Sequence, residues 1–255
     1  KSLMNLSGHY IGSKGKDIEF QDYSMLNVKG TGSYFTAANE IYAGVDVSSN
    51  NYYLYGYDHN AYSFLKSEIR QQFQDITISG GIRNTVSTKA DISYNPHMQL
   101  SFFTNKNKLS ETTVMLEAPV EMKVNEELAV KLKASGDFTS YSSRDMLPDR
   151  IKISNTILQV APSFEYTTSL IKLHGGITPT WNNGKFEWLP DVYAEVKVQD
   201  KIFLVQAGWI GRYTKNTYRN LSAINPYLKS LTEQNNTKEI EYYGGIKATL
   251  GNHFN

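Results

Sequence analysis

The sequence predicts an all-β protein, an antiparallel up-and-down transmembrane β-barrel with about 12 visible strands and 14 or more in the complete protein. Three observations support this fold class. Apolar and polar residues alternate along most segments, short and long connections alternate along the chain, and the tryptophans lie near the long connections.

Side-chain alternation places the strands in order along the chain. They are expected at 2–12, 24–36, 40–49, 75–83, 89–103, 112–123, 127–138, 151–166, 170–181, 186–197, 201–212 and 239–250. Connections at one end of this ladder have three to five residues, and those at the other end have four to 26. Outer-membrane barrels sort their loops in this way, with short periplasmic turns and long extracellular loops, whereas a soluble sheet has no reason to do so.

Segment 127–138 shows the alternation most clearly. Leu128 and Val130 lie on one face, and Lys131 and Lys133 lie on the other, because successive strand residues point to opposite sides. A soluble sandwich or lipocalin shows the same pattern. The two architectures differ in which face is inside, and alternation alone does not decide between them.

The three tryptophans favour the membrane alternative. Trp181, Trp188 and Trp209 share the apolar face near the long-loop end, and tryptophan concentrates where hydrocarbon meets lipid headgroups. We expect them to form an aromatic girdle, with the long loops on the outer surface. The competing interpretation is that they are core residues.

Composition indicates one domain over residues 1–255 and excludes several protein classes. A net charge of +1 gives no electrostatic basis for nucleic-acid binding. No segment has the roughly 18 consecutive apolar residues of a transmembrane helix, and the mean hydropathy is −0.44. A barrel nevertheless has such values, because only alternate residues face lipid.

Four segments resemble a known family. These are 51–58, 186–191, 216–221 and 225–228, with the sequences NYYLYGYD, FEWLPD, NTYRNL and NPYL. They are similar to outer-membrane β-barrel proteins of Bacteroidota, many of which are described only as TonB-dependent-receptor-like or uncharacterised. Members are longer, so the resemblance implies that this chain is incomplete at both ends. A TonB-dependent receptor also carries a plug domain, which this sequence does not show, so active transport is not implied.

A search for catalytic groups identifies no reactive site. His9 and His174 lie on polar faces outside any nucleophile motif, and we expect both to be wall residues. The other histidines are His59, His97 and His253. Asp58, His59 and Asn60 carry ligand atoms, but adjacent side chains diverge. The sequence therefore predicts no catalytic residue, no metal site and no cofactor.

Charged residues of both signs are expected to face the lumen. They are Asp46, Arg83, Asp91, Glu117, Glu121, Lys131, Lys133, Asp137, Glu165, Lys172, Asp191, Glu195, Lys197, Glu239, Glu241 and Lys247. In a wide lumen such groups tune ion passage, and in a narrow one they pair; the mixed sign favours pairing. Loops 50–74 and 213–238 are rich in tyrosine, and either expose a contact surface for a partner or glycan or fold inward as a lid.

The favoured function is a non-enzymatic component of the bacterial outer membrane, acting in transport or as a subunit of a larger envelope assembly. Its partners would be the lipid bilayer and other proteins of an outer-membrane complex. The alternatives are a soluble secreted barrel that binds an apolar ligand, and an outer-membrane hydrolase.

Overall fold

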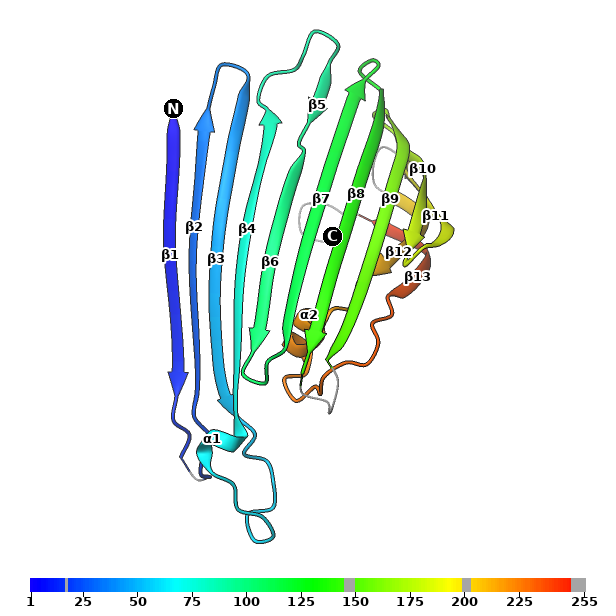
Figure 1. The fold of residues 1–255 in the computed structure, drawn as a ribbon. Coiled ribbons are helices and arrows are strands. Elements are labelled where there is room, and N and C mark those ends of the chain that lie inside the picture. The colour runs from blue at the N-terminus through cyan, green and yellow to red at the C-terminus, as the bar shows by residue number, and fades with distance from the viewer. Residues whose placement is uncertain (17, 145–149, 199–202, 249–255) are drawn as a thin grey trace.

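The computed structural model describes residues 1–16, 18–144, 150–198 and 203–248. Its architecture is one antiparallel sheet with two short helices (Figure 1). The strands are β1 (Ser2–Ser13), β2 (Tyr23–Phe35), β3 (Asn39–Tyr53), β4 (Arg70–Asn84), β5 (Ile92–Tyr94), β6 (His97–Asn105), β7 (Ser110–Lys123), β8 (Leu128–Ser143), β9 (Ile151–Thr167), β10 (Ile171–Asn182), β11 (Lys185–Val198), β12 (Phe203–Thr214) and β13 (Thr237–Ala248). The helices are α1 (Lys66–Ile69) and α2 (Tyr218–Ile224).

The sheet is curved. Strands follow one another in sequence order, apart from β5, which pairs with β7. Figure 1 shows β10 to β13 curling behind β8 and β9, with α2 inside the curve. We call the side of the sheet that faces α2 the concave face, and the opposite side the convex face. The all-β, antiparallel fold class predicted from the sequence is confirmed.

One predicted strand is interrupted in the structure. The segment 89–103 forms two strands, β5 and β6, separated by Asn95 and Pro96. Proline has no backbone N–H to donate to a ladder. The neighbouring stretch of β7 carries Pro119, whose carbonyl accepts from the N–H of Asn95 at 3.2 Å. The interruption at Asn95 and Pro96 thus lies beside Pro119 of the neighbouring strand.

The loop ends are sorted largely as predicted, although several bounds differ. The connection between β6 and β7 is 106–109 and not 104–111, and the connection after β8 begins after Ser143 and not at 139. β3 and β4 pair as far as Tyr53 and Arg70, so the loop between them is 54–69 and not 50–74. The connection after β4 is longer than the expected 84–88, because β5 lies between β4 and β6. At the long-loop end, β10 and β11 are joined by Asn183 and Gly184 alone, with φ angles of 49° and 82°. This is the asparagine-glycine pair that two-residue hairpins favour.

The described strands form an open sheet. β1 pairs with β2 and β13 pairs with β12, and within the described residues no ladder joins β1 to β13.

Neither α1 nor α2, the helices within the ranges described above, is long and apolar enough to cross a membrane.

Candidate functional site

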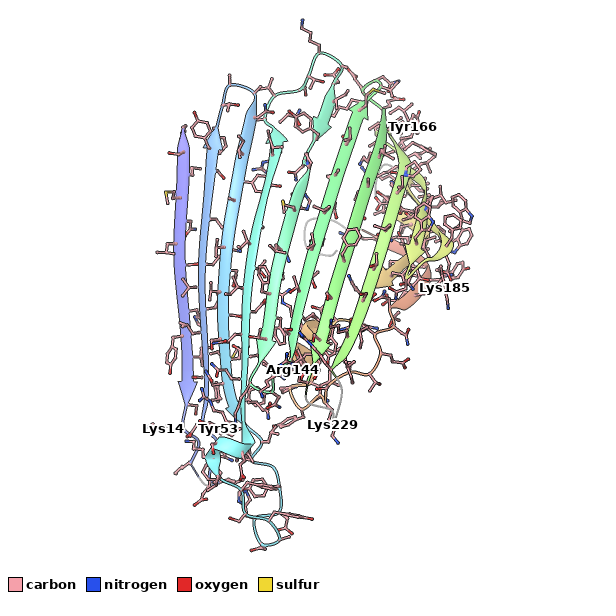
Figure 2. The ribbon with its side chains drawn as sticks, viewed as in Figure 1. Lys14, Tyr53, Arg144, Tyr166, Lys185 and Lys229 are labelled. Atoms are coloured by element: carbon pink, nitrogen blue, oxygen red, sulfur yellow. The ribbon has the colours of Figure 1, made fainter. Side chains whose placement is uncertain are left out.

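The convex face is apolar and exposed. Tyr218 of α2 packs on Phe73, Phe103 and Tyr141, so these side chains mark the concave face of their strands. Alternation then places Phe138 on the convex face, where it is 39% exposed. The large apolar side chains Val45, Ile78, Met98, Leu116, Val130, Leu132, Leu158, Phe164, Val192 and Val205 are exposed in the same way. Side chains project from both faces of the sheet (Figure 2). Apolar area this continuous favours a lipid environment over water.

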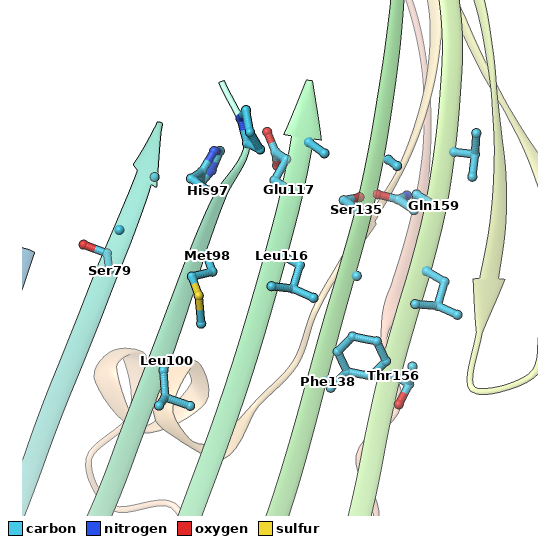
Figure 3. Close-up of a pocket in the computed structure, with 18 of the residues that line it drawn as sticks. Ser79, His97, Met98, Leu100, Leu116, Glu117, Ser135, Phe138, Thr156 and Gln159 are labelled. Carbon is cyan, nitrogen blue, oxygen red and sulfur yellow. The ribbon is translucent and has the colours of Figure 1, made fainter. Parts of the chain in front are cut away.

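A shallow depression interrupts the convex face (Figure 3). Gly80, Ala118 and Gly136 contribute no bulky side chain there, and Met98, Leu116 and Phe138 are among the larger residues that line it. The depression is part of the apolar surface, because its lining comes mainly from convex positions of β4 and β6 to β9.

The three tryptophans lie on the convex face toward the long-loop end. Trp181 and Trp188 both contact Phe186, with ring centroids 5.1 and 5.0 Å apart. Trp209 stacks on Tyr242 at 5.9 Å. Their exposed fractions are 38% for Trp181, 58% for Trp188 and 46% for Trp209. They therefore lie on the surface of the described chain and not in a core.

The concave face carries a charged network near its short-turn end. Lys131 on β8 lies 3.4 Å from Glu121 on β7 and 3.3 Å from Glu165 on β9. Lys172 on β10 extends the network to Glu165 at 3.9 Å. These four predicted wall residues come from four adjacent strands, so opposite charges pair across the ladder.

Other predicted wall charges form smaller groups. Nε2 of His174 lies within hydrogen-bond distance, 2.9 Å, of the Asp191 carboxylate, and the imidazole stacks on Tyr193. Arg212 contacts both Glu239, at 2.7 Å, and Glu241, at 3.2 Å.

Three more of the predicted lumen-facing charges have partners elsewhere on the sheet. Arg83 and Asp46 lie among β2 to β4, and Asp137 lies beneath the loop 215–236. Arg83 lies 2.6 Å from Glu40, which is 5% exposed. Asp46 accepts a 2.6 Å hydrogen bond from Asn27. Asp137 contacts Lys215.

The remaining predicted wall charges are not brought together. Glu117, Lys133, Glu195, Lys197 and Lys247 lie in strands, and none forms an ion pair with another described residue. Asp91 is not in a strand at all. It ends the connection between β4 and β5 with φ of 51°, and its carbonyl accepts from the N–H of Lys123.

The loop 215–236, which includes α2, folds inward against the concave face. Tyr218 is 2% exposed and packs in a cluster with Phe73, Phe103, Leu109 and Tyr141. Aromatic rings of this size dominate the burial that holds a loop on a sheet. This loop was expected either to expose a contact surface or to fold inward as a lid, and in the structure it folds inward. In loop 54–69, by contrast, Tyr62 is 61% exposed.

Glu111 on β7 anchors the N-terminus of α2. Its carboxylate accepts hydrogen bonds from the backbone N–H groups of Tyr218, at 2.7 Å, and Arg219, at 3.1 Å. Gln234, near the far end of the loop, donates to the same carboxylate at 2.9 Å. The first N–H groups of a helix lack partners within the helix, and a negative charge there is favourable. Glu111 falls just outside the expected strand 112–123 and is therefore not among the predicted wall residues.

Two cations of the loop make further contacts with the wall. Arg219 donates through Nε to Asp75 at 2.7 Å and through Nη2 to Thr77 at 3.4 Å. Lys215 donates to the side chain and, at 2.9 Å, to the carbonyl of Asp137. Burial of the Lys215 ammonium lowers its pKa, although the hydrogen bond to Asp137 opposes the shift.

Amide side chains hold the C-terminal end of the loop. Asn155 on β9 is fully buried and exchanges two hydrogen bonds with Asn236, of 2.8 and 2.7 Å. Asn236 also donates to Asn182 on β10 at 2.7 Å. The loop is thus fixed to the wall from β3 to β10.

A cavity of about 660 Å³ remains between the loop and the wall. Its walls come from the concave side of β2, β3, β4 and β6, and from residues 219–227. The lining is mixed, with tyrosine rings, amides and hydroxyls beside the Asp75–Arg219 pair. A chamber of this size accommodates a small ligand.

The described histidines lie on separate elements: His9 on β1, His59 in the loop 54–69, His97 on β6 and His174 on β10. His9 is exposed on β1, and His59 stacks on Tyr57 in a turn where Asp58 accepts from the N–H of Asn60. Nδ1 of His174 is buried with no hydrogen-bond partner among the described residues. Within the residues that the structure describes, no three acidic or histidine side chains lie close enough together to hold a metal ion. His253 lies outside the described residues.

Comparisons with known proteins show that this chain is similar in fold to solved structures of outer-membrane receptors. No family model matches the sequence, and no curated protein matches it. Structures of two mutants of the ferric enterobactin receptor PfeA from Pseudomonas aeruginosa match with TM-scores of 0.65 and 0.64, both at 10% identity. They cover 76% and 82% of this chain, and 34% and 36% of the receptor chains.

The FpvAI–pyocin S2 complex matches over 98% of this chain and 49% of that chain, with a TM-score of 0.61 and 9% identity. This chain therefore spans between about a third and a half of the chains that it matches. What it shares with them is architecture: it has the curved antiparallel sheet of outer-membrane receptor barrels.

Proposed function

We propose that this chain forms part of the wall of a bacterial outer-membrane barrel that acts in transport. The convex face contacts lipid, the concave face lines the lumen, and the long-loop end faces the medium. The observation that carries the proposal is the sorting of side chains by face. Exposed apolar residues cover the convex side, whereas ion pairs and the docked loop occupy the concave side.

The same sorting argues against a soluble barrel that binds an apolar ligand. Such a barrel would direct its apolar side chains toward the inside of the curve. Here the inside carries Lys131, Glu121 and Glu165 instead.

The docked loop favours restricted over free passage. The loop 215–236 crosses the concave face and is hydrogen-bonded to several strands. We therefore infer that the chain contributes to a closed or gated passage and not to a permanently open pore. A role as a subunit of an envelope assembly is the second candidate, and the exposed aromatic residues Tyr62 and Phe64 of loop 54–69 favour it as contacts for a partner.

Cysteine labelling tests which face contacts lipid, because the sequence contains no cysteine. Leu132 and Lys133 are neighbours on β8 with opposite orientations. In intact proteoliposomes, we expect Lys133→Cys to react with a membrane-impermeant maleimide and Leu132→Cys to react only after detergent is added. Equal labelling of both before detergent would refute the membrane orientation. Labelling of both in denaturant serves as the control for reactivity.

A further inference from the structure

The cavity beneath the loop 215–236 has the chemistry of a ligand site. Its polar lining includes Ser48 and Asn50 from β3, and Asn220 and Ser222 from α2. Tyr227 and Tyr23 line it with rings that are 58% and 42% exposed. Exposed aromatic faces beside hydroxyl and amide groups suit a ligand that is apolar on one side and rich in hydrogen-bonding groups on its edges.

The charges in the cavity restrict the ligand class. Asp75 and Arg219 are the charged residues of the described lining, and they pair with each other. An anionic or cationic ligand would therefore meet no unpaired opposite charge. The ligand that fits this balance is neutral.

The ion pair nevertheless retains hydrogen-bonding capacity. Oδ1 of Asp75 is buried without a hydrogen-bond partner among the described residues, which is costly unless something supplies a donor. Arg219 uses Nε and Nη2 toward Asp75 and Thr77, whereas its Nη1 has no hydrogen-bond partner among the described residues and can donate to a ligand oxygen. A free acceptor beside a free donor suits a hydroxyl group, which can both donate and accept.

We propose that this cavity binds a neutral saccharide of a few sugar units. The aliphatic face of the sugar ring packs on Tyr227, and the hydroxyl groups bond with Asp75, Arg219 and the amides of Asn50 and Asn220. Tyr52 positions the aromatic contact, because its hydroxyl donates to the carbonyl of Pro226 at 2.6 Å and its ring lies edge-on to Tyr227. The site rests on the proposed function in one respect, namely that the concave face lines a route for solutes.

Calorimetric titration of the full chain tests the proposal. The protein is purified in lauryldimethylamine oxide, because maltoside detergents carry sugar headgroups that would occupy the site. Maltotriose, cellotriose and chitotriose are the probes, and citrate and inorganic phosphate are the anionic comparisons. We expect at least one trisaccharide to bind saturably at one site per chain and neither anion to bind.

Two variants locate the binding. Tyr227→Ala should weaken the affinity about tenfold, the effect of losing one well-packed aromatic contact. Tyr62→Ala, which removes an equally exposed ring from loop 54–69, should leave the affinity unchanged. Failure of all three trisaccharides to bind, binding of an anion instead, or equal affinity in Tyr227→Ala would overturn the saccharide site. None of these results changes the cysteine-labelling pattern, so the two proposals can fail separately.

Discussion

The carboxylate of Glu111 accepts a 2.7 Å hydrogen bond from the backbone N–H of Tyr218, although 107 positions separate the two residues in the sequence. Both residues are only 2% exposed. A buried carboxylate is stable only when it is hydrogen-bonded, and buried backbone donors have the same requirement. The contact therefore satisfies both partners, and it ties the start of α2 to the middle of the sheet.

The first prediction concerns this anchor. Glu111→Ala should weaken docking of the loop 215–236 by about 1.5–3 kcal/mol, because two backbone donors and the Gln234 amide lose a charged acceptor. Amide hydrogen exchange in α2 should then accelerate about ten- to one-hundredfold. Glu117→Ala, on the same strand and face, is the matched control. If the amides of α2 exchanged at the same rate in Glu111→Ala as in the wild type, the anchoring role of Glu111 would be excluded.

A second prediction concerns the aromatic cluster. Tyr218→Ala removes the ring that packs on Phe73, Phe103 and Tyr141, and should destabilise the docked loop by about 3 kcal/mol. Limited proteolysis should cut within 215–236 much faster than in the wild type. Tyr218→Phe loses only the hydroxyl that donates to the carbonyl of Leu228, so its cleavage rate should lie close to that of the wild type. Equal cleavage of Tyr218→Ala and the wild type would show that the cluster does not hold the loop.

A disulfide should lock the loop onto the wall. Oγ of Ser143 on β8 lies 3.0 Å from Oγ of Ser230 in the loop, which is close enough for paired cysteines to form a bond. We expect the oxidised Ser143→Cys/Ser230→Cys variant to suppress current fluctuations in a planar bilayer, and a reductant to restore them. The two single-cysteine variants should not respond to redox conditions. Larger conductance in the oxidised form would contradict a gating role for the loop.

The strands were predictable because side-chain alternation is a local property of the chain. Segment 127–138 shows it. The rest of β8, up to Ser143, was not predicted, because its one large aromatic residue, Tyr141, lies on the opposite face from Leu128 to Phe138 and is buried only by the docked loop. The break at Pro96 was missed although proline interrupts ladders, because the apolar pattern continues through it.

The candidate site was less predictable, because it depends on contacts between distant segments. Glu111 and Asp75 gain their roles only when the loop 215–236 folds back onto the wall. Which face of the sheet α2 covers also depends on tertiary contacts. Side-chain alternation defines two faces but does not say which one is covered. The tyrosine-rich composition of loop 213–238 pointed to a functional segment, but not to its inward position.

The last prediction concerns the aromatic girdle. Trp181, Trp188 and Trp209 are the only tryptophans in the sequence, so intrinsic tryptophan fluorescence reports on them alone. If they lie where acyl chains meet headgroups, lipids brominated near the headgroup should quench them more than lipids brominated near the chain end. Trp188→Phe should lower the total emission and keep that depth profile, because Trp181 and Trp209 are also expected at the interface between acyl chains and headgroups. Stronger quenching by the deep label would place the tryptophans at the bilayer centre, and quenching by aqueous iodide alone would remove them from the membrane.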